Sequence, residues 1–552
     1  MKRITYYVLP AIGLLLLGLV LGVQVNSFSS DESAYEQLEK LQNAFVIITR
    51  QYVDPVESKN LVEDGIEGML EALDPHSIYI PAEDVQSVQD SYEGSFGGIG
   101  IQFEVVEDTA RVISPIADGP SDQLGILPGD RIVGIEGESA VGIGSNGIQD
   151  RLKGDVDTEV TITIYRPPTN QEEEYTITRD EIPMHSVNTS YMVDDHTGYI
   201  KVDRFAMTTY DEFMEHATDL SEQGMNRMIL DLRGNPGGVM RAAVEMVDEM
   251  LSDGLAIVET KGRERTMNNT FRASGGGAFE DKPIIVLVDR GSASASEIVA
   301  GALQDHDRAL VVGSRTFGKA LVQQQFELDD GSLMQMTVGR YYTPVGRLIQ
   351  TPYEGGTPED YIQTKIEEYQ DSELDPTEYA ESMPDSLTFT TEQGRTVFGG
   401  GGITPDIVMQ PDTSSVTTFV SAVNMDFAFM RDWFVENEQH VRSEWGDDAE
   451  YFVRNFSTPD SLVTSFWDFT EEQGMSYTTD PSEVAASQGV FLHADRDDSD
   501  EVIRTRLKGT LARQLYGLAE AQPILNESDP VYQRALSLWE DAEHLSSYHR
   551  TD

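Results

Sequence analysis

Between residues 199 and 314 the sequence alternates apolar runs with amphipathic stretches, and this alternation limits the possible fold more than any other feature. Four runs have the composition of strands: GYIKVDRF, RMILDLRG, KPIIVLVD and RALVVGS. The segments that follow the first three predict helices over residues 210–223, 239–251 and 294–304. Strands that alternate with helices predict an α/β core built of layered strand–helix units.

Residues 94–182 show a different pattern, made of short strands and turns. GGIGIQFEVV and ARVISPI are strand-like, EVTITIYRPP alternates with period two, and GILPGDRIVGIEG places a Pro-Gly-Asp turn before a strand. A short helix is expected over residues 146–153. The segment resembles a PDZ domain, which we place at residues 92–182 as a mainly-β insertion.

The resemblance to PDZ domains implies a peptide-binding loop. GIGI stands where that family binds a terminal carboxylate, and LGILPGDRIVGIEG is the most recognisable stretch. Successive backbone N–H groups bind an anion, and the adjacent strand edge can add a peptide strand. An ordinary glycine-rich hairpin is the alternative reading of GIGI alone. The residues expected to bind substrate here are Gly98, Ile99, Gly100 and Ile101.

Both ends of the chain have helical patterns. Residues 31–91 carry an apolar stripe formed by Leu38, Leu41, Phe45 and Ile48, and a second helix is expected over residues 61–73. The α/β core is placed at residues 183–412, with an acidic, proline-punctuated insertion at about 352–395. Residues 413–552 are predicted to form a mostly helical region to which no chemistry is assigned.

The first 30 residues predict a membrane anchor. Lys2 and Arg3 precede an uncharged run over residues 4–30, which is long enough to cross about 30 Å of hydrocarbon as a helix. The positive charge before the run favours an extracytoplasmic body, periplasmic or at the cell surface. We therefore expect a single-pass protein attached to the membrane through this helix; a removed signal peptide is the alternative.

The charge and the cysteine count exclude several classes of function. The formal net charge is −57, with 96 acidic against 39 basic residues, so nucleic acid is not an expected partner. The even spread of acid along the chain favours adaptation to high salt, a halophilic trait, over an acidic partner-binding tail. The sequence has no cysteine, which removes disulfides, thiolate metal sites and cysteine nucleophiles. No metal and no organic cofactor is predicted.

The candidate for the chemistry is GSASASEIVAGALQDHDRALVVGSRTFGKALVQ, residues 291–323. An apolar strand ends in a tight turn, and a helix begins near Ser294, so a side chain is presented beside free N–H donors. Ser294 and Glu297 also have the spacing of a capping box, which is the structural alternative. His306 lies twelve residues along the helix, about 18 Å away, and is therefore not the expected base.

Lys319 is the remaining candidate base in this segment, and a histidine from a distant part of the chain is the alternative. A lysine takes a proton only when it is neutral, so its pKa must fall several units from about 10.4 through burial. The apolar neighbours of Lys319 supply such a setting, and the amide of Gln323 could orient the amine. A solvent-facing lysine is the alternative.

These segments resemble the active-site signature of the C-terminal processing peptidases, the tail-specific serine proteases. SASASEI and TFGKALVQ match that signature, with Ser294 and Lys319 separated by 25 residues. The resemblance covers about residues 36–409 and includes LDPHSIYI, LDLRGNPGG, YYTPVGRLIQ and GGGGITPDI. It implies a nucleophile, Ser294, a base, Lys319, and a residue that supports the base, Gln323. Ser292 and Ser296 are left as turn and cap residues.

The family also implies an oxyanion hole. The NPGG glycines and the residue after the nucleophile supply its donors, which correspond here to the backbone N–H groups of Gly237, with Gly238 beside it, and Ala295. The alternative is that the NPGG glycines form only a strand-to-helix turn, which would need glycine as well. Ala320 replaces the usual glycine after the lysine, which is tolerated unless the backbone requires a positive φ.

The function implied by the resemblance is that of a serine endopeptidase of the C-terminal processing type. Its PDZ domain would capture proteins or peptides with free apolar C-termini, and a Ser-Lys dyad would cleave them through an acyl-enzyme. A homo-oligomer is possible. The alternative is a non-catalytic PDZ scaffold or adaptor with a vestigial site.

Overall fold

The structure is a computed structural model that describes residues 31–106, 108–116, 119–167, 169–353, 361–365, 383–409, 415–446, 448–484 and 489–548. The predicted anchor, residues 4–30, lies outside these ranges. None of the helices within them is long and apolar enough to cross a membrane. The first of them, α2 (Asp31–Gln51), carries charged side chains along its length. The prediction of a membrane-anchored, single-pass localisation is therefore corrected: the structure does not support it.

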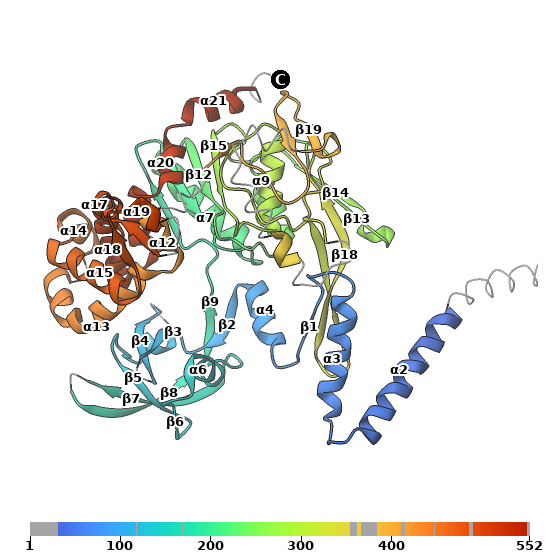
Figure 1. Cartoon of the computed structure of the whole chain (residues 1–552), viewed down its shortest axis with the longest axis horizontal. Helices are drawn as coiled ribbons and strands as arrows, with labels where there is room; N and C mark the ends of the chain where they lie inside the picture. Colours follow the sequence, from blue (N-terminus) through green and yellow to red (C-terminus); the bar gives the residue numbers. More distant parts are fainter. Residues whose placement is uncertain are drawn as a thin grey trace, which may run out of the picture. The chain divides into compact units, whose positions relative to one another are not determined.

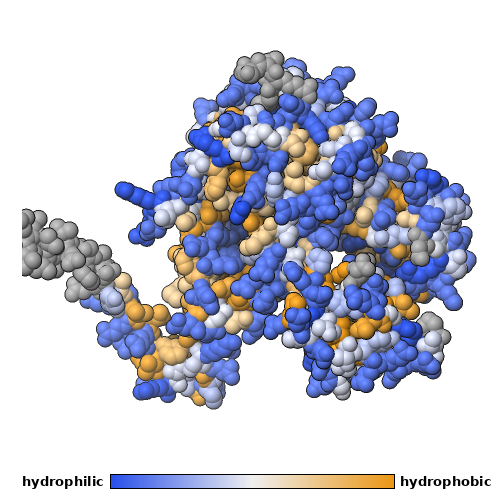
Figure 2. Space-filling view, turned by 180° about the vertical axis from the view of Figure 1, so that it is seen from behind, coloured by the Kyte–Doolittle hydropathy of each residue, from blue (hydrophilic) through white to orange (hydrophobic). Residues whose placement is uncertain are grey.

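The chain forms two compact units, residues 1–79 and 80–552. In the first, the described part contains α2 and α3 (Ser58–Glu71), and it leads into β1 (Ile78–Ile80). The predicted apolar stripe lies on α2 but is not buried within this unit, because the exposed fractions of Leu38, Leu41 and Ile48 are 59%, 51% and 40%. Figure 2 shows such apolar side chains on the surface.

The first helix of the second unit is α4 (Val85–Glu93). Strands β2 (Ser95–Gly98) and β9 (Asp180–Pro183) pair with each other, and the strands of an antiparallel sheet lie between them in the chain. The strand order in this sheet is β3-β4-β5-β7-β8, so β3 is an edge strand, and β6 pairs with β5. Alternate apolar side chains of these strands pack with α6. The elements are β3 (Ile101–Val106), β4 (Thr109–Pro115), α5 (Pro120–Gln123), β5 (Arg131–Ile135), β6 (Glu138–Ser139), α6 (Gly144–Leu152), β7 (Glu159–Arg166) and β8 (Gln171–Thr178).

The core is a six-stranded sheet in the order β10-β11-β12-β15-β16-β21, in which all neighbours are parallel except β10 and β11. Side chains on its two faces alternate along each strand. On β12, Met228 and Leu230 pack with α7, α8 and α9, whereas Ile229 packs with α20 and α21. The elements are β10 (Thr189–Met192), β11 (Thr197–Lys201), α7 (Thr209–Glu222), β12 (Arg227–Asp231), α8 (Met240–Asp248), β15 (Ile284–Val288), α9 (Ala295–Asp305), β16 (Leu310–Gly313) and β21 (Ile407–Val408).

A second sheet in the core holds β13, β14, β17 and β18. Its strands β17 and β18 form a long antiparallel pair that follows the helix α9 in the chain. Much of the predicted acidic insertion, residues 354–360 and 366–382, lies outside the described ranges. The elements of this part are β13 (Ala256–Gly262), η1 (Arg265–Met267), β14 (Asn269–Arg272), β17 (Leu321–Glu327), β18 (Leu333–Tyr342), η2 (Asp385–Leu387), β19 (Thr388–Thr390) and β20 (Thr396–Phe398).

The C-terminal region is mainly helical, as predicted, and has its own apolar core. Its last two helices leave that core and cover the second face of the central sheet, where Tyr532, Leu538 and Trp539 are buried (Figure 1). The elements are α12 (Val416–Ala422), α13 (Met425–Trp445), α14 (Ala449–Asn455), α15 (Asp460–Glu472), β22 (Ser476–Thr478), α16 (Pro481–Val484), β23 (Val490–Leu492), α17 (His493–Asp498), α18 (Asp500–Tyr516), α19 (Leu518–Glu527), α20 (Pro530–Leu536) and α21 (Trp539–Tyr548).

The predicted fold class is confirmed: an α/β core of strand–helix units carries an inserted, mainly-β domain, and helices form both ends of the described chain. The predicted domain boundaries stay predictions. The packing of α20 and α21 on the core sheet is a feature that the division at residue 412 did not anticipate.

Candidate active site

Ser294 lies at the turn between β15 and α9, directly before the first helical residue. Its backbone has φ +54° and ψ −110°, a conformation that costs a non-glycine residue about 1–3 kcal/mol. The turn before it is closed by Asp289, whose Oδ1 accepts the backbone N–H groups of Gly291 and Ser292 at 2.9 and 3.1 Å. The strained serine is therefore held by its surroundings.

Glu297 lies in the first turn of α9 and is fully buried. Its Oε2 accepts the backbone N–H groups of Ser294 and Lys319, both at 2.8 Å. Its Oε1 accepts the hydroxyl of Thr316 at 2.6 Å and the N–H of Gly318 at 2.7 Å. Burial raises the pKa of Glu297, while these four hydrogen bonds oppose that shift. One carboxylate thus joins the serine turn to the lysine turn.

Tyr341, on β18, makes a second connection between the same two residues. Its hydroxyl lies 3.0 Å from the carbonyl oxygen of Ser294 and 2.7 Å from that of Lys319. Burial, and then the charge of Glu297, raise the pKa of Tyr341 and keep the hydroxyl protonated. The hydroxyl has one hydrogen, so Tyr341 donates to one of these two carbonyl oxygens at a time, while Glu297 accepts both N–H groups.

Ala320, the departure from the family pattern, fits without strain. It is fully buried, it is absent from the described residues with positive φ, and its N–H donates to Gln350 Oε1 at 2.9 Å. A methyl group is therefore compatible with the backbone conformation at this position.

A cleft of about 810 Å³ brings the predicted residues together. Ser294, Lys319, Gln323 and Gly237 all line it. Gln323 lies on β17, and its Oε1 accepts a hydrogen bond from Gln335 Nε2 at 3.3 Å. The other lining residues come from α4, the loops after β11 and β12, the first residue of α8, α9, β17 and β18.

The predicted oxyanion donors lie beside the serine. A Cβ atom on Gly237 would come within 2.7 Å of Ser294 Cβ and 2.9 Å of the Ala295 nitrogen. The N–H of Gly237 itself donates to Asn235 Oδ1 at 2.9 Å. Among the described residues, no acceptor takes the N–H of Gly238 or of Ala295. Two unpaired N–H groups and one engaged N–H group therefore surround the nucleophile.

The other candidates in the serine segment have structural contacts. Ser292 Oγ donates to the carbonyl oxygen of Leu232 at 2.8 Å, and Ser296 Oγ donates to that of Asn235 at 3.0 Å. His306 ends α9 and contacts the carbonyl of Ala256 through Nε2 at 2.6 Å. The residues that line the described cleft do not include a histidine.

The PDZ loop is formed but lies outside the cleft lining. The carbonyl of Ile99 accepts the N–H of Ser121 at 3.1 Å, and the carbonyl of Gly100 accepts the N–H of Ile116 at 2.9 Å. Within the described part of the chain, the N–H groups of Ile99 and Gly100 have no acceptor. The loop follows β2 and precedes the edge strand β3, so the site expected for a terminal carboxylate lies beside a strand that can accept a peptide.

Tyr341, Asn235 and Gln350 were not identified as site residues from the sequence. They lie in YYTPVGRLIQ and LDLRGNPGG, segments that were noted as whole motifs without a role for each side chain. These three residues could have been predicted from their positions near glycine-containing turns. Such turns leave backbone N–H and carbonyl groups without partners, and tyrosine or amide side chains can form hydrogen bonds with those groups.

Comparisons with known proteins show which family the chain is similar to. Residues 196–362 match the model of peptidase family S41, residues 97–177 match the PDZ domain, and residues 22–84 match the N-terminal domain of the activating protease CtpB. A carboxy-terminal-processing protease of Bartonella bacilliformis is 37% identical over 336 residues, which are 60% of this chain and 77% of the relative.

Two further matches have related names. The carboxy-terminal processing protease CtpB of Bacillus subtilis is 32% identical over 326 residues, 58% of this chain and 67% of the relative. Among solved structures, a photosystem II D1 C-terminal processing protease is 25% identical with a TM-score of 0.35, covering 68% of this chain and 87% of that one.

Proposed function

The chain belongs to the carboxy-terminal processing proteases of peptidase family S41 and is a serine peptidase, and we propose that Ser294 and Lys319 form its catalytic dyad. The observation that carries this proposal is the shared carboxylate of Glu297, which accepts the N–H groups of both residues at the edge of one cleft. The shared acceptor holds the two residues in a fixed relative position.

The proposed reaction begins with the attack of Ser294 Oγ on the substrate carbonyl carbon. Neutral Lys319 takes the hydroxyl proton and then gives it to the leaving amine, so that the peptide bond breaks and an acyl-enzyme remains. The amine of Lys319 then takes a proton from water, which attacks the carbonyl carbon of the acyl-enzyme, and Lys319 returns that proton to Ser294 Oγ as the ester bond breaks. Gln323 lines the cleft on the strand after Lys319 and is proposed to help orient the amine.

The oxyanion that forms during the attack needs preorganised donors. The N–H groups of Ala295 and Gly238 have no acceptor among the described residues, and that of Gly237 is engaged by Asn235. We assign the hole to Ala295 together with the Gly237–Gly238 backbone. Gly237 can contribute once its bond to Asn235 is exchanged for one to the oxyanion.

Substrate capture is assigned to the loop Gly98–Ile101. The unpaired N–H groups of Ile99 and Gly100 support carboxylate binding there. Peptides with a free apolar C-terminus are expected to be cleaved with a higher kcat/KM than the same peptides with an amidated C-terminus. Equal values for the two peptides would remove this role from the loop.

The relatives are named proteases, which argues against the alternative of a non-catalytic scaffold, and one digestion assay tests the proposed role of Ser294. The protein should cleave casein or a tagged peptide, and a folded Ser294→Ala variant should not. Equal digestion by both proteins would remove Ser294 from the mechanism. No digestion by either, with the PDZ domain still binding peptide, would favour the scaffold.

Self-association is proposed for the first unit. Leu38 and Leu41 are more than half exposed on α2 although they belong to an apolar stripe, and a second copy of this helix could cover them. Light scattering should give an oligomer for the wild-type protein and a monomer for Leu38→Glu/Leu41→Glu. A wild-type monomer at micromolar concentration would contradict this.

A further inference from the structure

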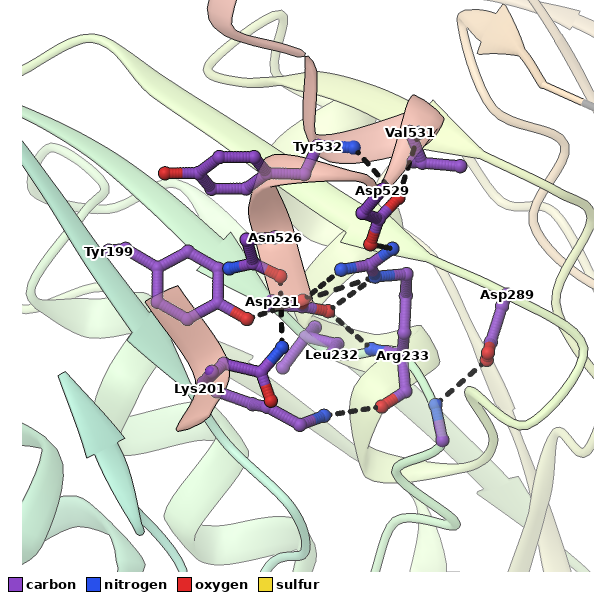
Figure 3. A network of polar contacts seen from close by, with 12 residues as sticks. Tyr199, Lys201, Asp231, Leu232, Arg233, Asp289, Asn526, Asp529, Val531 and Tyr532 are labelled. Carbon is purple, nitrogen blue, oxygen red and sulfur yellow. Dashed lines mark hydrogen bonds and ion pairs between the residues drawn. The ribbon is translucent and has the colours of Figure 1, made fainter. Parts of the chain in front are cut away.

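A row of charged side chains joins the end of the C-terminal region to the loop that carries Gly237. Asp231 ends β12 and is buried, and its carboxylate accepts hydrogen bonds from Arg233 Nε at 3.0 Å and from Arg233 Nη2 at 2.6 Å. On its other side, Arg233 Nη1 donates to Asp529 Oδ2 at 2.5 Å. Figure 3 shows the guanidinium of Arg233 between these two carboxylates. Asp529 is 296 residues away from Arg233 in the sequence.

Asp529 has a separate role for each of its carboxylate oxygens. Oδ1 accepts the backbone N–H groups of Val531 and Tyr532 at 2.9 and 3.2 Å and thereby caps α20. Capping needs only that one oxygen. Oδ2 is directed at Arg233, outside its own helix. The ion pair between Asp529 and Arg233 is therefore not required for capping α20.

Arg233 is the first residue of the R-G-N-P-G-G loop, and the loop is fixed from that residue onward. The Arg233 carbonyl accepts Lys201 Nζ at 3.0 Å. The N–H of Gly234 donates to Asp289 Oδ1 at 2.8 Å, and the same oxygen holds the turn that precedes Ser294. Asn235 Nδ2 donates to the carbonyl of Val202 at 2.8 Å.

The end of this loop lies against the nucleophile. The carbonyl of Asn235 accepts both Ala293 N–H and Ser296 Oγ at 3.0 Å. Gly237 follows two residues later, at a position where even a methyl group would collide with Ser294 Cβ. A change in the position of Arg233 is therefore passed along a short, densely bonded segment to the oxyanion donors.

We propose that Asp529 is a positioning residue for the oxyanion loop, which acts through Arg233 and makes the C-terminal helical region part of the catalytic apparatus. The inference rests on the proposed function, because it concerns the hole that serves Ser294. Without the Asp529 carboxylate, Arg233 keeps its contacts with Asp231, so the loop stays folded but is held from one side only. Donors that stabilise a developing oxyanion lose effect when they shift by fractions of an ångström.

The test uses the full chain and the substitution Asp529→Asn. An asparagine oxygen can still cap α20, since Asn and Asp are comparable caps, but its amide offers Arg233 no charge. The expected result is a kcat about tenfold lower, with KM within about twofold of wild type, in a protein that still unfolds cooperatively at a somewhat lower melting temperature. The KM should not move because neither the PDZ loop nor the cleft lining contains Asp529.

Two further variants sharpen the result. Asp448 caps α14 through the N–H of Tyr451, so Asp448→Asn changes a capping aspartate of the same region elsewhere and should leave kcat unaltered. Asp529→Glu returns the carboxylate and should recover most of the lost kcat. A glutamate variant as impaired as the asparagine variant would overturn the charge-based role.

The remaining outcomes are also decisive. A wild-type kcat in folded Asp529→Asn overturns the inference. If that variant does not fold, Arg233→Lys replaces it: one amine cannot bridge Asp231 and Asp529 as the forked guanidinium does, so kcat should again fall at constant KM, and an unchanged kcat overturns the inference. Ser294→Ala separates this failure from failure of the proposed function, because residual turnover there would refute the dyad whatever Asp529 does.

Discussion

Ser294 and Lys319 donate their backbone N–H groups to one and the same atom, Glu297 Oε2, at 2.8 Å each. They lie on different turns, one at the start of α9 and one before β17. Because the carboxylate is buried, each hydrogen bond to it is strong and its loss is costly. The relative position of the two residues is thus set by a third residue that does not itself need to touch substrate.

The first prediction concerns this shared acceptor. Glu297→Gln replaces one acceptor oxygen with a donor NH₂ group, so at least one buried N–H group loses its partner. We expect turnover to fall about 100-fold and the free energy of unfolding to fall by about 1–3 kcal/mol. Peptide hydrolysis and urea titration measure both. Full turnover in Glu297→Gln would show that the shared carboxylate does not position the dyad.

The second prediction compares two glycines of one loop. Gly237 and Gly234 both have positive φ, at +92° and +72°, so alanine is strained at either position. At Gly237 the new methyl group would also meet the Ala293 oxygen at 2.6 Å and Ser294 Cβ at 2.7 Å, whereas at Gly234 it meets nothing within 4 Å. Gly237→Ala should lower kcat about 100-fold or more.

Gly234→Ala is the matched control. It should cost about 1 kcal/mol of stability from backbone strain and leave kcat near the wild-type value. The same loss of activity in both variants would mean that strain in the loop, and not the approach of Gly237 to the serine, is responsible.

The core was predictable because its signals are local. Runs such as KPIIVLVD alternate with helical segments, and observed helices such as α7 (Thr209–Glu222) begin and end within a few residues of the expected positions. The Ser294 and Lys319 segments could be found because residues on short turns carry the family signature. Glu297 was seen only as part of a capping box, since spacing does not reveal that its oxygens also reach Gly318 and Lys319.

The contacts of the C-terminal region could not be predicted, because they are long-range. Nothing in the composition of residues 530–548 says that their apolar side chains cover Ile229 and Leu287 of the central sheet. The pairing of Asp529 with Arg233 likewise joins two unremarkable charged residues across almost 300 positions. The membrane span was predicted from a strong local pattern at residues 4–30, and these residues lie outside the part of the chain that the structure describes.

The third prediction follows from the pKa of Asp231. Burial alone would raise this pKa, but the charge and hydrogen bonds of Arg233, and then the charge of Lys201, outweigh burial and hold it at about 2. The unfolded value is about 3.9. Ionised Asp231 therefore stabilises the folded state above about pH 4, and this contribution is lost as the pH falls toward 2.

The comparison of wild type with Asp231→Asn isolates the contribution of ionised Asp231 to the free energy of unfolding, since all other groups titrate in both proteins. The difference between their free energies of unfolding should be about 1 kcal/mol smaller at about pH 3 than at about pH 6. Urea titrations at the two pH values measure it. A difference that is the same at both would mean that Asp231 has no depressed pKa.

The fourth prediction concerns salt and keeps the halophilic hypothesis open to test. With a net charge of −57, self-repulsion destabilises the folded protein at low ionic strength. Raising NaCl from about 0.1 M to about 1 M shortens the screening length from about 10 Å to about 3 Å, so the melting temperature should rise. A flat or falling melting temperature would count against salt adaptation.

The most direct test of the dyad is the turnover of a pure, folded Lys319→Ala variant on a peptide with a free apolar C-terminus. His306→Ala is its control, because His306 lies at the far end of α9 and its ring contacts the Ala256 carbonyl. We predict no turnover above background for Lys319→Ala and wild-type turnover for His306→Ala. Substantial hydrolysis by folded Lys319→Ala, or its loss in folded His306→Ala, would contradict the Ser294–Lys319 mechanism.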